Sequence, residues 1–384
     1  MRILHLIVDH QVIERTLGIY EKVFPGSNDV ILFPMFNKNR EIKHLNHYKS
    51  SRYVNVGEGK NVALKINFSE YSHIVAHYLT MDMVSFIKEV PQSIHFTWEI
   101  YGWDLYNQFL THKGFELTSI SIAPYEKYGY FKKYMPNLFD LALYATGHNV
   151  NFTYQKKAAF EFICSRVNSL QYCCYYDAKY VEQYAKRSIE SYEIFNYSLN
   201  TVLGELIDKP FFEGTDILIG NSASFTNNHM YIYKYINDIQ VNNDTKFIIP
   251  LSYGGPAKYV QDVQTLYSNK WPDKVDILLD YMPLHEYNKI FLRLRCMILS
   301  AWRQESQGTA IMGLYLGVKV IMSERSPLYK WFKECGFVVF SLEKSNKTDY
   351  NSGLRYVEKL HNRNIVLERY NEQAFEETLK LHFK

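Results

Sequence analysis

The chain has 384 residues, of which 47% are hydrophobic and 22% are charged, and this composition excludes a disordered or fibrous protein. At about 150 residues per domain, the length predicts two domains, each with its own core. The 43 Lys and Arg residues nearly balance the 40 Asp and Glu residues, so no basic face for nucleic acid is expected.

The apolar runs of the sequence are short. The longest, such as residues 3–8 and 318–322, are far below the roughly 20 residues that cross a bilayer, and no signal-peptide pattern comes before the first of them. We therefore expect a cytoplasmic protein that can bind peripherally to the inner face of the cell membrane. Five cysteines in apolar surroundings, without a metal-type CxxC, predict buried free thiols; they are Cys164, Cys173, Cys174, Cys296 and Cys335.

Short runs rich in β-branched residues predict buried parallel strands in the first half of the chain. These runs are residues 2–8, 30–35, 52–56, 73–79, 93–98, 160–164, 170–175 and 192–197. Segments with helical spacing, residues 12–23 and 81–89, lie between several of them. The alternation of strand and helix predicts a parallel sheet that is covered on both faces.

The second half repeats this pattern, which predicts a second doubly wound α/β domain. Strands are expected at residues 216–220, 246–251, 275–279, 296–300, 318–322 and 337–340, and helices at 228–239, 257–267, 284–292 and 309–316. Turn-forming residues interrupt both periodicities between residues 198 and 214. We therefore predict domains at 1–205 and 206–363, and a helical tail at 364–384 that packs back towards the first domain.

In this architecture ligands bind at the carboxyl ends of the strands, so we expect a site in a central cleft between the two domains. No GxGxxG, GxxxxGK[ST] or Asp-x-Asp motif occurs, which disfavours dinucleotide, P-loop and metal-clamped sites. His44 and His47 have no further ligand candidates at zinc spacing. We predict a site without metal or cofactor, where backbone amides and cations hold an anion.

The first candidate segment follows the predicted strand 216–220. Gly220 lets the backbone come close to a ligand, while Asn221 and Ser222 offer hydrogen bonds to phosphate or hydroxyl groups. The alternative is an ordinary strand-to-helix turn, in which Thr226 or Asn227 caps the next helix.

The second candidate segment lies before the predicted helix 309–316. Free amides and the positive helix dipole form an anion site there, and Arg303 adds a cation whose fork fits phosphate. Each charge-assisted bond contributes about 1.5–3 kcal/mol. The alternative is a capped helix beside a surface arginine. The other members of this predicted site are Glu305, Ser306, Gln307, Gly308 and Thr309.

The third candidate segment combines acidic and aromatic residues at the end of the predicted strand 93–98. Trp98, Tyr101 and Trp103 can stack on a ring, while Glu99 or Asp104 removes a proton from its hydroxyl group. The alternative for Asp104, which follows shortly after a glycine, is a helix N-cap.

Three further features are weaker. His10 and His77 fall at predicted strand ends that face the expected cleft, although a lone histidine is usually structural. Residues 124–143 interleave lysines with aromatic residues, a mixture that suits an anionic membrane surface or, alternatively, an ordinary amphipathic helix.

At these segments the chain resembles the bacterial TDP-N-acetylfucosamine:lipid II N-acetylfucosaminyltransferases of enterobacterial common antigen assembly. The resemblance covers residues 98–106 and most of the second half, where it includes Gly220, Asn221, Ser222, Asn227, His229, Pro250, Tyr253, Arg303, Gln304, Gly308 and Thr309. It implies a GT-B glycosyltransferase with two Rossmann-like domains around a central cleft. It also implies a TDP-activated donor sugar of the deoxyamino or fucose type and a polyprenyl-diphosphate-linked saccharide acceptor.

This resemblance assigns roles to the predicted residues. The nucleotide base would lie near Tyr253, Met282 and His285, and the diphosphate on residues 306–309 with Arg303 and Ser222. Glu305 would contact the donor sugar. The first domain would bind the acceptor through His10, His77, Trp98, Tyr101 and Trp103, and Asp104 or Glu99 would activate its hydroxyl.

Two departures from the resembled family matter. The family has His at the position of Glu99, so the proton acceptor can differ from the family's or can be Asp104 in both. Many GT-B enzymes place a ribose-binding Glu eight residues after the position of Glu305, where this chain has Gly313. This absence fits a deoxyribose donor such as TDP.

Two alternative functions remain open: a nucleotide-sugar epimerase or hydrolase of the same fold, and a non-catalytic scaffold in a polysaccharide assembly complex.

Overall fold

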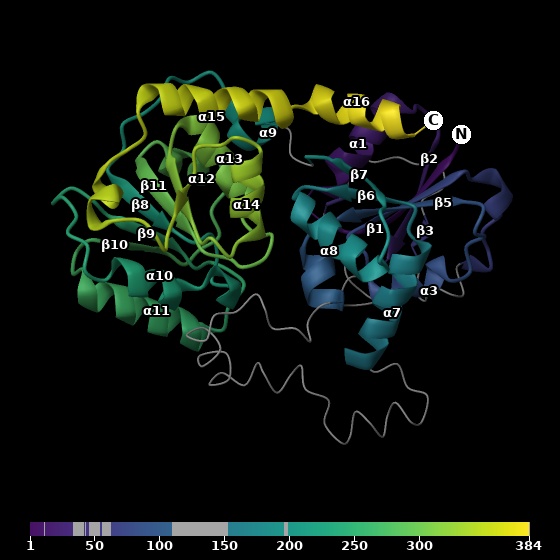
Figure 1. The fold of residues 1–384 in the computed structure, drawn as a ribbon, viewed down its shortest axis with the longest axis horizontal. Coiled ribbons are helices and arrows are strands. Elements are labelled where there is room, and N and C mark those ends of the chain that lie inside the picture. The colour runs from purple at the N-terminus through teal and green to yellow at the C-terminus, as the bar shows by residue number, and fades with distance from the viewer. Residues whose placement is uncertain are drawn as a thin grey trace. The chain divides into compact units, whose positions relative to one another are not determined.

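The computed structural model describes residues 1–10, 12–33, 42, 44–45, 54–55, 63–109, 153–195 and 199–383. These residues form two compact units (Figure 1). The first unit holds the described residues up to 195 together with 370–383, and the second unit holds residues 199–369. The acceptor and donor roles expected for the two parts of the chain stay predictions, as do their boundaries.

A parallel sheet of seven strands forms the centre of the first unit, in the order β3-β2-β1-β4-β5-β6-β7. The strands are β1 (Ile3–Val8), β2 (Asn28–Phe33), β3 (Val54–Asn55), β4 (His73–His77), β5 (His95–Ile100), β6 (Ser169–Tyr172) and β7 (Glu190–Glu193). Every residue of β1 is buried, as expected for a strand that is covered on both faces.

The helices of the first unit include one from the end of the chain. They are α1 (Ile13–Val23), α3 (Met81–Ile87), α7 (Thr153–Arg166), α8 (Tyr175–Ala185) and α16 (Glu372–His382), with a π-helix at Asp104–Phe109 and a 3-10 turn at Phe68–Glu70. The Asn371 side chain caps α16 by accepting a hydrogen bond from Ala374 N at 2.8 Å. Phe375 and Leu379 of α16 share a buried cluster with Ile3 and Tyr20.

The strand predicted at residues 160–164 is wrong, because these residues lie inside α7. Ala159, Phe160, Ile163 and Cys164 are all buried, and this spacing places them on one face of a helix. Within so short a window, adjacent apolar positions of a helix read as a continuous strand-like run.

A parallel sheet of six strands forms the centre of the second unit, in the order β10-β9-β8-β11-β12-β13. Its strands are β8 (Asp216–Ile219), β9 (Phe247–Pro250), β10 (Val275–Leu278), β11 (Leu294–Leu299), β12 (Lys319–Met322) and β13 (Phe340–Ser341). Its helices are α9 (Leu199–Leu203), α10 (His229–Ile236), α11 (Ala257–Lys270), α12 (Leu284–Phe291), α13 (Gln307–Leu316), α14 (Pro327–Glu334) and α15 (Tyr356–Arg369), with 3-10 turns at Gly204–Leu206, Phe225–Asn227 and Lys347–Asn351.

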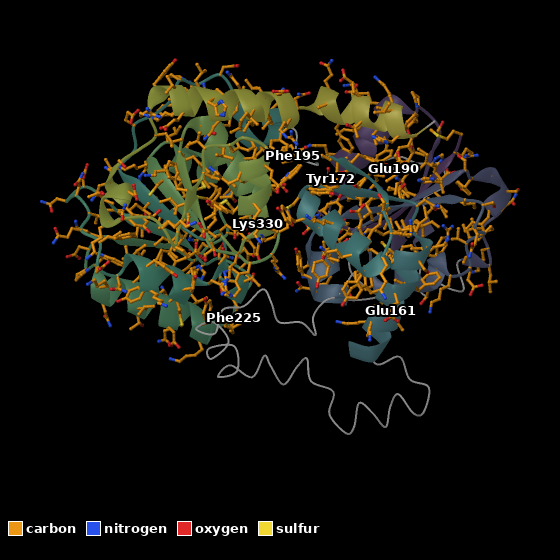
Figure 2. The ribbon with its side chains drawn as sticks, viewed as in Figure 1. Glu161, Tyr172, Glu190, Phe195, Phe225 and Lys330 are labelled. Carbon is orange, nitrogen blue, oxygen red and sulfur yellow. The ribbon has the colours of Figure 1, made fainter. Side chains whose placement is uncertain are left out.

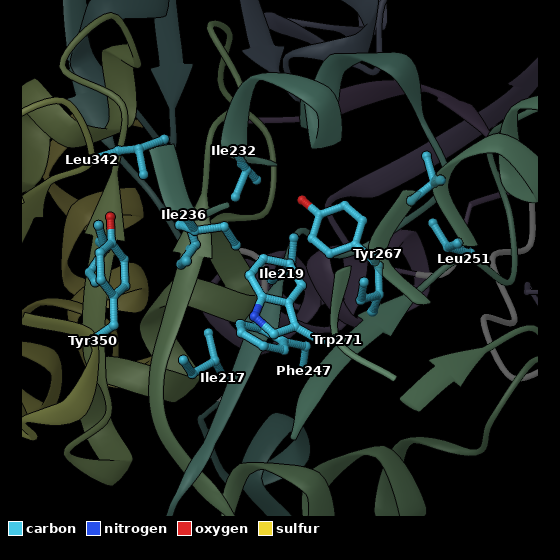
Figure 3. Packing of buried hydrophobic residues seen from close by; sticks show 14 of the residues in the cluster. Ile217, Ile219, Ile232, Ile236, Phe247, Leu251, Tyr267, Trp271, Leu342 and Tyr350 are labelled. Atoms are coloured by element: carbon cyan, nitrogen blue, oxygen red, sulfur yellow. The ribbon is translucent and has the colours of Figure 1, made fainter. Parts of the chain in front are cut away.

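The main apolar cluster of the second unit joins its sheet to α10 and α11. Ile217 and Ile219 of β8 pack with Ile232 and Ile236 of α10, and Trp271 closes the cluster after α11 (Figure 3). The opposite face of the sheet carries Met297, next to α13. Both units therefore have the predicted doubly wound α/β arrangement.

Candidate functional site

The loop after β8 brings the chain close to itself at Gly220. Gly220 has φ +66°, and a Cβ atom there would lie 2.9 Å from Asn227 Oδ1 and 3.0 Å from His229 Nε2. Only glycine fits this conformation without strain. The Asn227 amide closes the loop, because its oxygen accepts from Asn221 N at 2.9 Å and its nitrogen donates to Ser222 Oγ at 3.0 Å.

Glu305 joins this loop to the segment that follows β11. Its carboxylate accepts hydrogen bonds from the Thr226 hydroxyl and from Asn227 Nδ2, the second at 3.3 Å. Arg303 Nε lies 3.0 Å from Glu305 Oε2, and both side chains are largely buried. The predicted cation is therefore held in place by a carboxylate. The observed contacts of Glu305 are with protein groups, so its predicted contact with the donor sugar stays a prediction.

Helix α13 starts directly after this segment, with no side chain capping it. Ser306 precedes the helix in a left-handed conformation, with φ +66°, and makes no side-chain cap hydrogen bond. Gln307, Gly308 and Thr309 form the first turn, where backbone N–H groups have no partner within the helix. Such an end attracts anions through its N–H groups and the helix dipole.

Buried polar atoms without a hydrogen-bond partner gather on the segments that follow β8 and β11. Within the described part of the chain, five such atoms lie there: Asn221 Oδ1, His229 Nε2, Ser300 Oγ, Trp302 Nε1 and Ser306 Oγ. Most buried polar atoms in proteins are paired with protein or with water. A group of unpaired atoms at the carboxyl ends of two adjacent strands therefore indicates a place for a polar ligand.

His229 is the most enclosed member of this group. Its Nδ1 lies 3.0 Å from the Tyr259 hydroxyl, and burial lowers the pKa of His229 to about 4. The imidazole is therefore neutral at pH 7, with Nε2 beside Gly220. Phe225, labelled in Figure 2, packs on Tyr259 with a centroid distance of 4.4 Å and anchors the same loop.

The residues expected near a nucleotide base lie on the loops after β9 and β10. Tyr253 is 57% exposed, and its carbonyl oxygen accepts from Ala223 N at 2.8 Å, which ties it to the β8 loop. Met282 is half-buried and His285 is exposed. Because β9 and β10 follow β8 in the sheet, these side chains and the start of α13 belong to the same edge of the second unit.

In the first unit, Asp104 is buried, and each of its carboxylate oxygens accepts two hydrogen bonds. Trp98 Nε1 and Leu79 N donate to its Oδ2 at 2.8 and 3.1 Å, and Tyr101 N and Leu105 N donate to its Oδ1 at 3.0 Å each. Burial raises the pKa of Asp104 to about 7, against the opposing effect of these donors. These contacts are not those of the helix N-cap expected as the alternative, because Asp104 begins the π-helix itself and accepts from residues before it and from Leu105 N. The catalytic role of Asp104 stays a prediction.

Glu99 also lies in the interior, in a polar chain that crosses the sheet. His77 Nδ1 contacts Glu99 Oε2, His77 Nε2 lies 2.9 Å from His5 Nδ1, and His5 Nε2 lies 3.1 Å from Asn28 Oδ1. Glu99, His77 and Trp98 have no exposed surface. This burial does not support the predicted direct contacts of these three residues with an acceptor.

The other predicted acceptor residues form an aromatic group at the ends of β1, β4 and β5. His10 stacks on Tyr78 with centroids 5.3 Å apart, Tyr78 stacks on Trp103 at 5.2 Å, and Tyr101 meets His10 edge-on at 5.9 Å. His10, Tyr101 and Trp103 are each partly exposed. Burial lowers the pKa of His10 to about 4, and its Nδ1 has no hydrogen-bond partner among the described residues.

Sequence reasoning missed several residues of these groups. Tyr78, Ser300 and Trp302 were not predicted, and His229 entered only through the resemblance. Tyr78, Ser300 and Trp302 share one signal, a position shortly after a strand at the edge where the ligand is expected. The basic and aromatic segment 124–143 lies outside the described residues. Among the helices that the structure does describe, none is long and apolar enough to span a membrane.

Residues 140–380 match the model of a protein family described as 4-alpha-L-fucosyltransferase, glycosyl transferase group 56. In fold, a glycosyltransferase from Rickettsia africae is similar with a TM-score of 0.57 and 11% identity, over 99% of this chain and 97% of its own. HepE from Anabaena, in complex with UDP and glucose, gives 0.58 and 10%, over 99% and 98%. A sucrose-phosphate synthase from Thermosynechococcus elongatus gives 0.56 and 9%, over 99% and 98%. These likenesses confirm the GT-B fold.

Proposed function

Because the chain belongs to the 4-alpha-L-fucosyltransferase family, glycosyl transferase group 56, we propose that this GT-B glycosyltransferase uses a TDP-activated sugar of the fucose or deoxyamino type. The observation that carries the proposal is the edge of the second unit where the uncapped start of α13 meets the ion pair of Arg303 and Glu305 and five unpaired polar atoms. Solved neighbours that bind UDP and glucose support a nucleotide-sugar donor.

In the proposed reaction an acceptor hydroxyl oxygen bonds to the anomeric carbon while the bond from that carbon to the β-phosphate oxygen breaks. Negative charge grows on the leaving diphosphate, and the hydroxyl proton passes to a base. Prearranged N–H donors at residues 307–309 and the cation of Arg303 stabilise that charge more in the transition state than in the ground state. Glu305 positions Arg303, since it holds the guanidinium at 3.0 Å.

The choice of TDP rests on the resemblance to enzymes with TDP-activated donors, and Gly313 agrees with it because this position offers no carboxylate to a ribose 2′-hydroxyl. This residue packs against β11, and a Cβ atom there would come within 2.1 Å of Met297 Cε. A carboxylate side chain on Gly313 would point into the sheet and could not serve a ribose 2′-hydroxyl. The deoxyribose of TDP has no such hydroxyl to bind.

We infer that His10 is better placed than Asp104 or Glu99 to contact the acceptor, because it is the only one of the three with a partly exposed side chain. Its ring lies among the partly exposed rings Tyr101 and Trp103. Both carboxylates are fully buried. A general base must come within hydrogen-bond reach of the acceptor hydroxyl.

For the acceptor we propose a polyprenyl-diphosphate-linked saccharide, reached at the inner membrane face in surface polysaccharide assembly. The sequence feature that supports a membrane contact is the lysine- and aromatic-rich segment 124–143. The reaction needs no metal in this proposal, because amides and Arg303 neutralise the diphosphate.

Replacement of Arg303 tests the proposal. Arg303→Ala should lower the rate of TDP release from a TDP-sugar in the presence of a lipid-linked acceptor by more than about tenfold, the loss expected for one charge-assisted bond in the transition state. Lys333→Gln, which removes an exposed cation on α14, is the control and should keep the wild-type rate.

The competing results are distinct. An Arg303→Ala rate within about twofold of wild type would exclude the assigned role. Equal TDP release with and without acceptor would favour the hydrolase or epimerase alternative, and a wild-type protein that binds TDP but releases none from any TDP-sugar would favour the scaffold.

A further inference from the structure

Arg325 lies stacked on an aromatic ring at the edge of the second sheet. It follows β12, and its guanidinium carbon lies 4.3 Å from the centroid of the Trp302 ring, which follows β11. The Arg325 side chain is exposed. No carboxylate in the described part of the chain forms an ion pair with it.

The carboxylate of Glu343 fixes both the loop that carries Arg325 and, through Tyr231, the Trp302 ring on which Arg325 stacks. Glu343 accepts hydrogen bonds from Ser323 Oγ at 2.6 Å, from Glu324 N at 2.9 Å and from the Tyr231 hydroxyl at 3.1 Å. The Tyr231 ring in turn meets Trp302 edge-on, with centroids 5.8 Å apart. The Trp302 ring and the loop that carries Arg325 are therefore held in position in the absence of a ligand.

Two carboxylates belong to or contact the loop that carries Arg325, and both have other partners. Glu324 forms an ion pair with Lys344 at 2.6 Å, and Glu343 accepts the hydrogen bonds described above. Trp302 Nε1 is buried without a partner among the described residues. Arg325 thus has no ion-pair partner among the residues that the structure describes, and stacking leaves the N–H groups in the plane of its guanidinium available for an oxyanion.

The strand order places this cation beside the proposed diphosphate position. Tyr253 belongs to the β9 side of the edge, α13 starts after β11, and Arg325 follows β12, the neighbour of β11 on the other side. We propose that Arg325, held on Trp302, forms an oxyanion subsite that takes a phosphate or carboxylate group. The inference rests on the proposed function for the source of that group, which is either the donor diphosphate or an anionic group of the second substrate.

Calorimetric titrations of the full-length protein test this subsite. TDP is titrated into wild type and into Arg325→Gln, and inorganic phosphate and glucuronate are then titrated into each protein saturated with TDP. The loss of one charge-assisted bond should weaken binding by about tenfold or more. Weaker TDP binding in Arg325→Gln assigns the subsite to the donor diphosphate. Unchanged TDP binding with loss of phosphate or glucuronate binding assigns it to the second substrate.

Matched variants separate charge from stacking. Arg325→Lys keeps the charge without the planar fork and should fall between wild type and Arg325→Gln, while Trp302→Leu should weaken the same ligand with Arg325 intact. Lys333→Gln should behave as wild type.

The subsite is refuted if Arg325→Gln binds TDP, phosphate and glucuronate within about twofold of wild type. It is also refuted if wild type binds none of the three. A wild type that binds phosphate through Arg325 but not TDP would refute the proposed donor and leave the subsite standing.

Discussion

Asp104 accepts four hydrogen bonds while it is fully buried. Three donors are backbone N–H groups, and they belong to Leu79 after β4 and to Tyr101 and Leu105 around the turn that follows β5. The carboxylate therefore joins the carboxyl ends of two neighbouring strands. These are the ends that carry Tyr78, Tyr101 and Trp103, so Asp104 shapes the surface on which the proposed acceptor would lie.

Asp104→Asn replaces one acceptor oxygen with an NH2 group that faces N–H donors. We expect the free energy of unfolding of the first unit to fall by about 2–3 kcal/mol, the cost of buried groups left unpaired. Urea unfolding followed by hydrogen exchange in residues 73–109 measures this change. Glu89→Gln, at an exposed carboxylate, is the control. An Asp104→Asn protein that loses activity while its stability is unchanged would instead favour the catalytic prediction.

Sequence patterns predict single residues well where the chemistry is local. Gly220 and Arg303 stand out by type and by position after a strand, and the structure gives each a defined contact. Arg325 and Trp302 could not be predicted together, because their contact depends on how two separate strands lie next to each other. The burial of Glu99 depends on His77 in the same way.

Helix α13 connects the proposed anion-binding turn to the sheet through a close approach at Gly313. The nearest atoms to a Cβ there would be Met297 Cε at 2.1 Å and Met297 Sδ at 3.0 Å. The helix axis can therefore lie close to β11, which holds the N–H groups of the first turn near the end of that strand. Packing of this kind fixes the direction of the helix dipole.

Substitutions at Gly313 test this packing. Gly313→Ala should lower the free energy of unfolding of the second unit by about 1 kcal/mol, because overpacking exceeds the gain in helix propensity. Gly313→Glu should lower it by more than about 3 kcal/mol, because a carboxylate is forced against the sheet. Urea denaturation measures both. A Gly313→Glu protein as stable as wild type, with improved binding of UDP over TDP, would contradict the proposed reason for TDP.

Elements of the second sheet could be predicted to within a few residues where apolar runs are continuous and end at turn-forming residues. The predicted strand 246–251 is observed as β9 (Phe247–Pro250), and the predicted helix 257–267 as α11 (Ala257–Lys270). The strand predicted at 337–340 shrinks to Phe340–Ser341, because only these residues pair with β12. The tail predicted as one helical stretch divides at Asn371, which caps α16.

Over the whole molecule, histidines with a lowered pKa are unevenly divided between the two units. Burial is the main cause that lowers the pKa of His5, His10, His73 and His95 in the first unit and of His229 in the second. A group whose pKa is lower in the folded state binds fewer protons there than in the unfolded chain. Stability is therefore lost as the pH falls from about 6.5 towards the folded pKa values.

We expect the first unit to lose more stability than the second between pH 7 and pH 5. His229 alone accounts for about 1 kcal/mol per pH unit below 6.5 in the second unit. The raised pKa of Asp104 has the opposite effect, because it makes the first unit more stable as the pH falls over the same range. This one carboxyl group opposes four histidines in that unit. Hydrogen exchange, corrected for the intrinsic rate at each pH, measures protection in both units. Earlier loss of protection in residues 199–369 would contradict the expectation.

The packing of α16 against α1 has a consequence for biosynthesis. A ribosome makes residues 199–369 after most of the first unit and before α16, so the nascent amino-terminal part must wait with Ile3 and Tyr20 uncovered. The second unit can complete its own core during this interval. The core of the first unit is thus completed only after the second unit has been made, and a chaperone that shields the uncovered surface would act before that step.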